Sequence, residues 1–476
     1  MAQDLRTFLS EIINAYPSDV ISVEKEVDPR LGITAYVEKF ENQKLNPVLF
    51  FPKVKNTKIP VLTNVHSSFD RLALSIQTKT KPEAVLEFGN RADHPIAPTI
   101  VKTGKVKEVV LTGDKAQVSL LPQIVHNEMD GGPYICSAGT ILRDPETGVH
   151  NVGIYRNQIK GNRIGLMMNP TAHGSHMMGL YKDMKKPMEV AIVVGHHPAF
   201  LLSAGGARLP GIGGEFELTG GLLKEPLELV KAETIDMLYP ANAEIVIEGV
   251  IDDVSILEQE GNFGEYPRYY SGEKTVPYIR VTGICMRHDA IFEDVMAAHD
   301  EHIVMGSLPR MATYLQRVKA NAAYVNMVSL PKSASSRAAM YINIKKRNDG
   351  EGKQAGIAGL AADPNVKMVV VVDEDIDVFD EEQVWWAVAF RCEMDRSLVL
   401  IPNTIGAHLN PSSYAVDRSK HGVMNTRVII DATWPIKSFE KVPKANGSKE
   451  LLAQVSQNDW KKGAVNELLS RLQGSM

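Results

Sequence analysis

The chain contains few cysteines and no surplus of positive charge. Its three cysteines, Cys136, Cys285 and Cys392, lie too far apart in the sequence for a CxxC metal site or redox pair, and unpaired thiols fit a reducing, cytoplasmic location. The 52 Lys and Arg residues are balanced by 57 Asp and Glu residues, which gives a formal net charge of -5. The positive field that non-specific nucleic-acid binding requires is missing, so we expect no nucleic-acid partner.

Long apolar runs and nucleotide-binding motifs are also absent. The most apolar stretch, KMVVVVDED at 367–375, is far too short to cross a bilayer, so no membrane partner is expected. The glycine-rich segment GGARLPGIGGEF at 205–216 lacks the GxGxxG spacing. The segment DGEGKQAG at 349–356 lacks the first glycine and the final Ser or Thr of a Walker motif. The chain has no HExxH or GxSxG sequence either.

The composition that remains is that of a folded protein with several domains. Hydrophobic residues make up 44% and charged residues 23% of the 476 residues, and roughly 150 residues per domain suggest about three domains. Residues 1–105 begin with a helical pattern and continue with the short apolar runs 47–51 and 59–65, which predicts an α/β domain. The apolar residues of that first helix are Leu5, Phe8, Leu9, Ile12 and Ile13.

The rest of the chain divides into two further predicted domains. Residues 106–315 contain many short β-branched runs broken by glycine, which predicts a mainly antiparallel barrel or sandwich. From 316 to 476, an apolar strand at 366–372 precedes a helix near 384–394, as in a parallel α/β unit. The tail at 448–476 predicts an amphipathic helix that docks on a partner subunit or on its own chain. Its apolar residues are Leu451, Leu452, Val455, Val465, Leu468, Leu469 and Leu472.

Two short segments carry groups with possible chemistry. His173 and His176 have a spacing that one metal could bridge, although a surface loop or helix cap is the preferred interpretation of such a lone pair. Glu260 and Glu265 bracket the sequence Gly-Asn-Phe-Gly, and a tight turn there could bring both carboxylates to one site. Two nearby carboxylates beside an arginine have pKa values pushed apart, as a proton donor and its tuning partner require. Taken alone, the segment is better interpreted as a solvated glutamate-rich loop.

The sequence HNVGIYRNQ at 150–158, followed by EGNFGEYP at 260–267, resembles the UbiD-type decarboxylases, and the order of the elements matches along essentially the whole chain. These enzymes use prenylated FMN to remove or add CO2 on aromatic and unsaturated acids. The resemblance implies an N-terminal α/β domain, a central split β-barrel that binds the flavin, and a C-terminal α/β domain with a tail helix. It also implies a homodimer or higher oligomer and a flavin prenyltransferase that supplies the cofactor.

By this resemblance, Asn151, His173 and Glu215 are the metal ligands that anchor the cofactor phosphate. An amide oxygen, an imidazole and a carboxylate suit Mn2+ or Mg2+. The resemblance also implies K+ beside the same carboxylate and Lys353 near the phosphate. The main-chain carbonyls expected around K+ belong to the region of Val152, Ala204, Gly205 and Ala207.

The reactive end of the cofactor is implied to face Arg156, Glu260 and Glu265, with Glu265 as the proton donor. The strand residues Gly153, Ile154 and Tyr155 are implied to line the cofactor beside Arg156. In a regular strand, Asn151 and Arg156 point to opposite faces. Either Gly153 breaks the alternation, or the two side chains address different ends of a long cofactor.

The substrate pocket is less defined by the sequence. The resemblance places the segment from His302 to Met305 and the region of His408 and Asn410 around it, which favours a hydroxybenzoate-like or heteroaromatic acid. A core His302 and a surface His408 are the alternative. Many relatives carry a P-x-P segment where this chain has Arg208-Leu209-Pro210, so Arg208 contacts either substrate or solvent.

Two other functions remain open at the level of sequence. One is a flavin-binding subunit of a larger carboxylase complex that is inactive alone. The other is a simple FMN-dependent reductase on a split barrel, which would consume a nicotinamide cofactor. Intact Arg156, Glu260 and Glu265 favour an active decarboxylase over a degenerate subunit.

Overall fold

The computed structural model describes residues 4–170, 172–205, 214–413, 418–419, 422–436, 445 and 448–456. Residues 1–433 form one compact unit, and residues 434–476 form a second one, in which the described helix is α13 (Lys449–Gln454). The predicted tail helix thus begins with α13, while Val465, Leu468, Leu469 and Leu472 lie outside the described residues. None of the helices in the described part of the chain has the length and hydropathy needed to cross a membrane.

The N-terminal region is a small mixed sheet covered by helices, as predicted. Its helices are α1 (Leu5–Ala15), α2 (Gly32–Glu41), α3 (Phe69–Ser75) and α4 (Lys81–Ala92). Helix α1 starts where the Asp4 side chain accepts a hydrogen bond from the backbone of Thr7, and it buries Leu5, Phe8 and Ile12 on its own chain. The sheet order is β1 (Val20–Ser22), β2 (Val48–Phe51), β3 (Val61–Thr63) and β18 (Phe292–Asp294).

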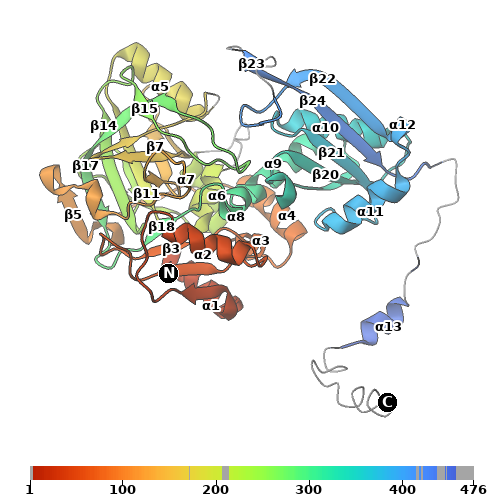
Figure 1. Ribbon diagram of the computed structural model, residues 1–476, viewed down its shortest axis with the longest axis horizontal. Coiled ribbons are helices and arrows are strands. Elements are labelled where there is room, and N and C mark those ends of the chain that lie inside the picture. The colour runs from red at the N-terminus through yellow and green to blue at the C-terminus, as the bar shows by residue number, and fades with distance from the viewer. Residues whose placement is uncertain are drawn as a thin grey trace, which may run out of the picture. The chain divides into compact units, whose positions relative to one another are not determined.

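The central region is a nine-stranded antiparallel sheet that curls into a half-barrel (Figure 1), which confirms the predicted central β-domain. Its long strands are β11 (Met188–Val194), β14 (Ile245–Ile251) and β17 (Tyr278–Met286). The remaining strands of this sheet are β5 (Val109–Thr112), β6 (Tyr134–Ile135), β7 (Gly139–Arg143), β8 (His150–Ile154), β9 (Asn157–Lys160) and β10 (Arg163–Gly165).

Alternation along these strands builds two cores. In β11, Val190, Ile192 and Val194 join a cluster on one face of the sheet, whereas Ala191 and Val193 face a second cluster. The second cluster contains residues of α6 (Pro198–Gly205) and α7 (Glu215–Leu223), two helices that are almost entirely buried. Helix α5 (His173–Met184) packs against β7 and β8, so the N-termini of α5 and α7 both lie beside β8.

The C-terminal region is an α/β sheet in the order β19 (Val325–Ser329), β20 (Ala339–Ile344), β21 (Met368–Asp373), β24 (Gly422–Ala432) and β22 (Leu398–Ile405). Strand β21 is parallel to both β20 and β24, as its apolar sequence predicted. Val369 and Val371 pack toward α10 (Glu351–Ala362), while Val370 and Val372 pack toward α11 (Glu381–Arg391). The predicted domain boundary near residue 315 falls inside α9 (Ser307–Asn321).

Candidate active site

The turn after β15 (Glu258–Glu260) brings three charged side chains together. Arg156 follows β8 and donates hydrogen bonds to Glu260 from Nε at 3.0 Å and from Nη2 at 2.6 Å. Its Nη1 donates to Glu265 at 3.0 Å and to the Ser271 hydroxyl at 2.5 Å. The side chains of Arg156, Glu260 and Glu265 are 6%, 0% and 16% exposed. A guanidinium bonded to two carboxylates this far from solvent is a strong, directional arrangement.

This turn needs glycine because neighbouring atoms leave no room for a Cβ atom at two of its positions. A Cβ atom on Gly261 would collide with the Gly131 Cα, and one on Gly264 would collide with the Asn127 amide. The Gly264 N–H donates to Asp130, which holds the turn against the loop before β6. The spacing Glu-Gly-Asn-Phe-Gly-Glu therefore reflects a close approach that larger residues exclude.

Burial sets the protonation behaviour of the two acids. It raises the pKa of Glu265, although the nearby Arg156 and Arg337 guanidinium groups oppose the shift. It also raises the pKa of Glu260, against the opposing effect of Arg156. A carboxyl group with a raised pKa keeps its proton closer to neutral pH than an ordinary glutamate does, and can donate it to a reacting carbon.

A cavity of about 540 Å³ lies next to this cluster, a size in the usual range for a small-molecule site. Its lining includes Arg156, Glu265, His302, Met305 and His408. The strand end at Ile154 and Tyr155 also lines it, so both faces of the chain after β8 border the same cavity. Asn410 lies outside this lining.

The predicted metal ligands Asn151 and Glu215 meet at the far end of β8. The Asn151 Nδ2 and the Val152 N–H both donate to Glu215 Oε2, at 3.1 and 2.9 Å. The Asn151 Oδ1 is buried and has no hydrogen-bond partner among the described residues. A buried amide oxygen beside a carboxylate is an arrangement that a hard cation satisfies.

His173 is the first residue of α5, next to Gly174, whose N–H donates to the Tyr155 hydroxyl. Burial and the Glu215 charge together raise the pKa of Tyr155 to about 12. The His173 and His176 rings stack at 6.4 Å between centroids. Within the described ranges, no three His, Cys, Asp or Glu side chains are grouped as a metal site, and the predicted ligands are one imidazole, one carboxylate and one amide.

Three predicted contributors lie elsewhere or outside the described residues. Lys353 is exposed on α10 and does not line the cavity, whose lining lysine is Lys274. Ala207 and Arg208 lie outside the described residues, whereas Ala204 and Gly205 end α6. The position of Lys353 beside the cofactor phosphate stays a prediction.

Several lining residues could not be recognised in the sequence. Arg337 stacks on the Tyr266 ring, with 4.2 Å from its guanidinium carbon to the ring centroid, and both line the cavity. Cys136 lines it too, and burial raises the pKa of its thiol to about 11. The only signal for Tyr266 was its position in the EGNFGEYP segment, while Arg337 stands in a stretch without a local pattern.

Comparison with protein families identifies the chain. Residues 16–91, 99–300 and 303–432 match the N-terminal, Rift-related and C-terminal domains of the 3-octaprenyl-4-hydroxybenzoate carboxy-lyase family. The chain belongs to this family, the UbiD-class decarboxylases, as its resemblance predicted.

Two curated relatives extend over nearly the whole chain. The anhydromevalonate phosphate decarboxylase of Methanothermobacter thermautotrophicus is 30% identical, over 94% of this chain and 100% of that protein. A phenolic acid decarboxylase of Sedimentibacter hydroxybenzoicus is 32% identical, over 91% of this chain and 92% of that protein.

Solved structures agree with this assignment. The UbiD-class enzyme HmfF from Pelotomaculum thermopropionicum, in complex with FMN, matches with a TM-score of 0.88 and 33% identity, covering 96% of this chain and 100% of that chain. An evolved dimeric form of HmfF with prFMN matches with a TM-score of 0.84 and 33% identity, over 96% and 100%. The vanillic acid decarboxylase of Sedimentibacter hydroxybenzoicus, ShVdcCD, matches with a TM-score of 0.84 and 29% identity, over 95% and 98%.

Proposed function

We propose that this chain reversibly decarboxylates an aromatic, heteroaromatic or α,β-unsaturated carboxylic acid with prenylated FMN, and that Glu265 is the proton donor. The observation that carries the proposal is the buried Arg156, bonded to both Glu260 and Glu265 at the edge of a 540 Å³ cavity. The flavin complexes of HmfF support the cofactor. A flavin prenyltransferase is then the partner that supplies it.

The residues at the two ends of β8 fit such a cofactor. Asn151, Glu215 and His173 would hold Mn2+ or Mg2+ and through it the phosphate, and the partnerless Asn151 Oδ1 supports this role. Carbonyls at Val152, Ala204 and Gly205 remain the proposed K+ ligands. When bound, prenylated FMN supplies the electron sink for the electrons that the departing CO2 leaves behind.

The chain's own residues then manage position and the proton. Arg156 holds Glu260 and Glu265 in place, and its charge lowers the free-energy cost of burying two acids. Glu265 keeps a proton because burial raises its pKa, and it delivers that proton to the carbon that has lost CO2. The apolar lining residues Phe263, Val295 and Met305 keep water away from this carbon.

The polar lining residues His302 and Arg337 favour an acid with an additional polar or anionic group. Burial lowers the pKa of His302 to about 3, so its ring is neutral. Its Nδ1 accepts the Ala298 N–H at 3.3 Å, which leaves the proton on Nε2 as a donor. Arg337 and the neighbouring Arg310 add positive charge there. We therefore favour a hydroxybenzoate-like, heteroaromatic or dicarboxylic acid over a plain cinnamate-like acid.

The test is a panel assay of the protein expressed with a flavin prenyltransferase and supplied with Mn2+. CO2 release is measured with hydroxybenzoates, heteroaromatic mono- and dicarboxylic acids, and cinnamates. We expect turnover of at least one acid from the first two groups. Turnover of cinnamates alone would refute the substrate preference, and release of CO2 from no acid by cofactor-loaded protein would refute the activity.

The alternative is a flavin-binding subunit that is inactive alone. The name of the similar enzyme ShVdcCD, which includes a separate ShVdcD component, is consistent with this alternative. It predicts a bound prenylated flavin, no turnover of any acid by the isolated chain, and activity after addition of a second subunit. The intact Arg156, Glu260 and Glu265 cluster favours activity of the chain itself.

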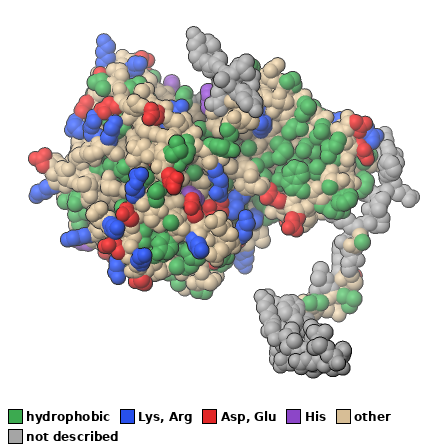
Figure 2. All heavy atoms as spheres, viewed as in Figure 1, with side chains coloured by type: hydrophobic (Ala, Val, Ile, Leu, Met, Phe, Trp, Pro, Cys, Tyr) green, Lys and Arg blue, Asp and Glu red, His purple; other side chains and the backbone are tan. Residues whose placement is uncertain are grey.

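Self-association is the remaining part of the proposal. Hydrophobic side chains gather over the C-terminal sheet (Figure 2). The exposed hydrophobic side chains of the C-terminal region include Phe390 on α11 and Leu400 and Ile405 on β22, which are 69%, 66% and 74% exposed. Strand β22 carries Leu400 and Ile405 and is the last strand of the described sheet. Its outer edge has no neighbouring strand there, and these two apolar side chains are exposed beside it. The match to a dimeric form of HmfF supports a homodimer or a larger homo-oligomer.

A further inference from the structure

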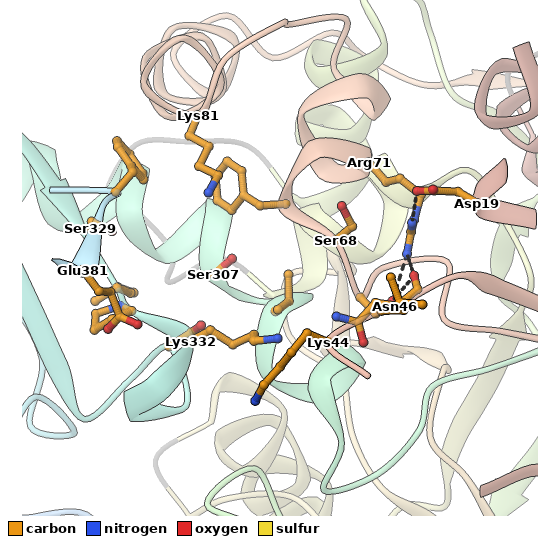
Figure 3. Close-up of a pocket in the computed structure, with 18 of the residues that line it drawn as sticks. Asp19, Lys44, Asn46, Ser68, Arg71, Lys81, Ser307, Ser329, Lys332 and Glu381 are labelled. Atoms are coloured by element: carbon orange, nitrogen blue, oxygen red, sulfur yellow. Dashed lines mark hydrogen bonds and ion pairs between the residues drawn. The ribbon is translucent and has the colours of Figure 1, made fainter. Parts of the chain in front are cut away.

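A second cavity, of about 500 Å³, shares no lining residue with the cavity beside Glu265. It is bounded by the segments 44–47 and 67–71, by the start of α9, and by the segment 329–332 (Figure 3). The proposed decarboxylation assigns no role to it. Its lining combines serine hydroxyls and lysine amino groups with aromatic rings.

Two polar atoms of this lining lack a hydrogen-bond partner among the described residues, Ser307 Oγ and Asn46 Oδ1. Ser307 is 2% exposed and is the first residue of α9, a helix of 15 residues. Its hydroxyl faces the hollow in Figure 3. A buried hydroxyl without a partner is a polar group that the fold itself leaves unsatisfied at the cavity wall. The helix N-terminus adds partial positive charge and favours an anion.

Lysine side chains reinforce this preference. Lys44 and Lys81 line the cavity, and neither forms an ion pair within the described part of the chain. Lys332 also lines it and is bound to Asp300 at 2.6 Å. Arg71 is committed to Asp19 and to backbone carbonyls. Among the cationic lining residues, Lys44 and Lys81 are therefore the uncommitted ones, and lysines bind phosphate as compact point charges. The lining carboxylate Glu381 accepts hydrogen bonds from the Ser333 and Tyr341 hydroxyls.

The apolar part of the lining indicates the rest of the ligand. The rings of Phe69 and Phe379 lie 6.2 Å apart between centroids, and Met311 lines the same space. An inorganic ion would leave these surfaces against water. An aromatic or branched apolar group attached to the anion would cover them.

The two cavities share walls. In the segment 302–307, His302 and Met305 line the cavity beside Glu265, whereas Val304 and Ser307 line the second one. The segment 332–337 also contributes to both cavities: Ser336 lines the second cavity, and its neighbour Arg337 lines the first. A ligand that orders these segments from one side acts on substrate-binding residues on the other.

We propose that this second cavity binds a small organic phosphate with an apolar body, held by Lys44, Lys81 and the N-terminus of α9, and that its occupation changes substrate affinity through the shared segments. Binding at this site does not require decarboxylase activity. The second half of the proposal rests on the proposed function.

Phenyl phosphate is the probe, and the full chain is titrated with it by isothermal titration calorimetry. Saturable binding to the wild-type chain is expected, with affinity reduced at least tenfold in a Lys44→Met, Lys81→Met double variant. Lys79→Met is the matched control, because Lys79 is exposed close to Lys81 but does not line the cavity. Its affinity for phenyl phosphate should equal that of the wild type.

A further variant locates the probe. Arg337→Met changes a residue that lines the cavity beside Glu265 and not the second cavity, and this variant should keep phenyl phosphate binding. The absence of binding, equal affinity in the double variant, or loss of binding in Arg337→Met alone would each overturn the proposal. Because these lysines lie on the surface of the cavity, their replacement should leave the fold intact. The thermal melting curve of each variant verifies this.

Coupling is measured with the cofactor-loaded enzyme and an acid that it converts. Phenyl phosphate should change the KM of that acid in the wild type and in Lys79→Met, but not in the double variant. Binding by calorimetry without any change in KM contradicts the coupling and leaves the site itself supported. An inactive wild-type enzyme points to failure of the proposed function, while calorimetry still decides whether the site exists.

Discussion

Arg156 has a structural role in addition to its proposed catalytic one. Its side chain is bonded to Glu260, which is fully buried, so removing the guanidinium leaves a carboxylate without compensation. We predict that Arg156→Ala lowers the free energy of unfolding by about 3–5 kcal/mol. Urea denaturation of the variant and wild type measures the difference.

Arg163→Ala is the matched control. Arg163 pairs with Glu258 on the same strand as Glu260, but both of these side chains are partly in solvent. An exposed pair of this kind contributes about 1 kcal/mol or less. Equal losses in the two variants would contradict a special cost at Arg156.

Glu265 should give the enzyme a limit at high pH. Its protonated form is the proposed donor, and burial raises its pKa, so kcat/KM should fall as pH rises through that raised value. Arg337 opposes the shift, and Arg337→Met therefore moves the alkaline limb to higher pH. A pH profile of kcat/KM for both proteins checks the direction. A limb that stays in place or moves to lower pH contradicts the assignment.

At the scale of single residues, the sequence predicted the cluster better than the cavity wall. Glu260, Glu265 and Arg156 stand in two segments with a distinctive spacing, and glycine is needed there because backbone packs against backbone. Arg337 and Cys136 have no such pattern around them. Only the folding of distant segments brings these two residues to the cavity.

The elements around β8 define the proposed metal end. Helix α7 begins at Glu215, and that carboxylate accepts hydrogen bonds from Asn151 and from the backbone of β8. We predict that Glu215→Ala loses bound Mn2+ and most of the bound flavin, whereas Glu265→Gln keeps both. Metal analysis and the absorbance of purified protein measure the two contents.

Glu217→Ala is the control for this experiment. Glu217 lies in the same first turn of α7 and is not among the proposed ligands. Its metal and flavin contents should match those of the wild type. Equal loss of flavin in Glu215→Ala and Glu265→Gln would remove the proposed division between a metal end and a proton-transfer end.

At the scale of elements, local sequence patterns predicted several of the strands and helices. The apolar runs at 47–51 and 366–372 became β2 and β21, and the N-terminal pattern became α1. Strand pairing was not readable in the same way. Strand β18 joins the N-terminal sheet beside β3, a contact between segments far apart in the chain that no local pattern specifies.

At the scale of the whole molecule, the apolar surface near β22 is the feature that the single chain leaves unexplained. If it is a self-association surface, Leu400→Lys should shift the protein toward a smaller species, because a charged side chain would be buried in an apolar interface. Sedimentation velocity measures the mass. Ile256→Lys, at a residue 63% exposed elsewhere, should leave the mass unchanged.

The three-part organisation was predictable because each part has its own hydrophobic pattern: helices with short strands, then dense β-branched runs, then apolar strands followed by helices. The predicted border at 315 falls inside α9, so it would divide a single helix. The predicted tail helix lies for the most part outside the described residues.

The central claim is that Glu265 protonates the carbon from which CO2 departs. The most direct measurement is turnover of an accepted acid in D2O by cofactor-loaded wild type and Glu265→Gln, with flavin content measured in both. We predict deuterium at that carbon in the wild-type product and a rate at least about a hundredfold lower in the variant at equal flavin content. Undiminished turnover by flavin-loaded Glu265→Gln would contradict the account.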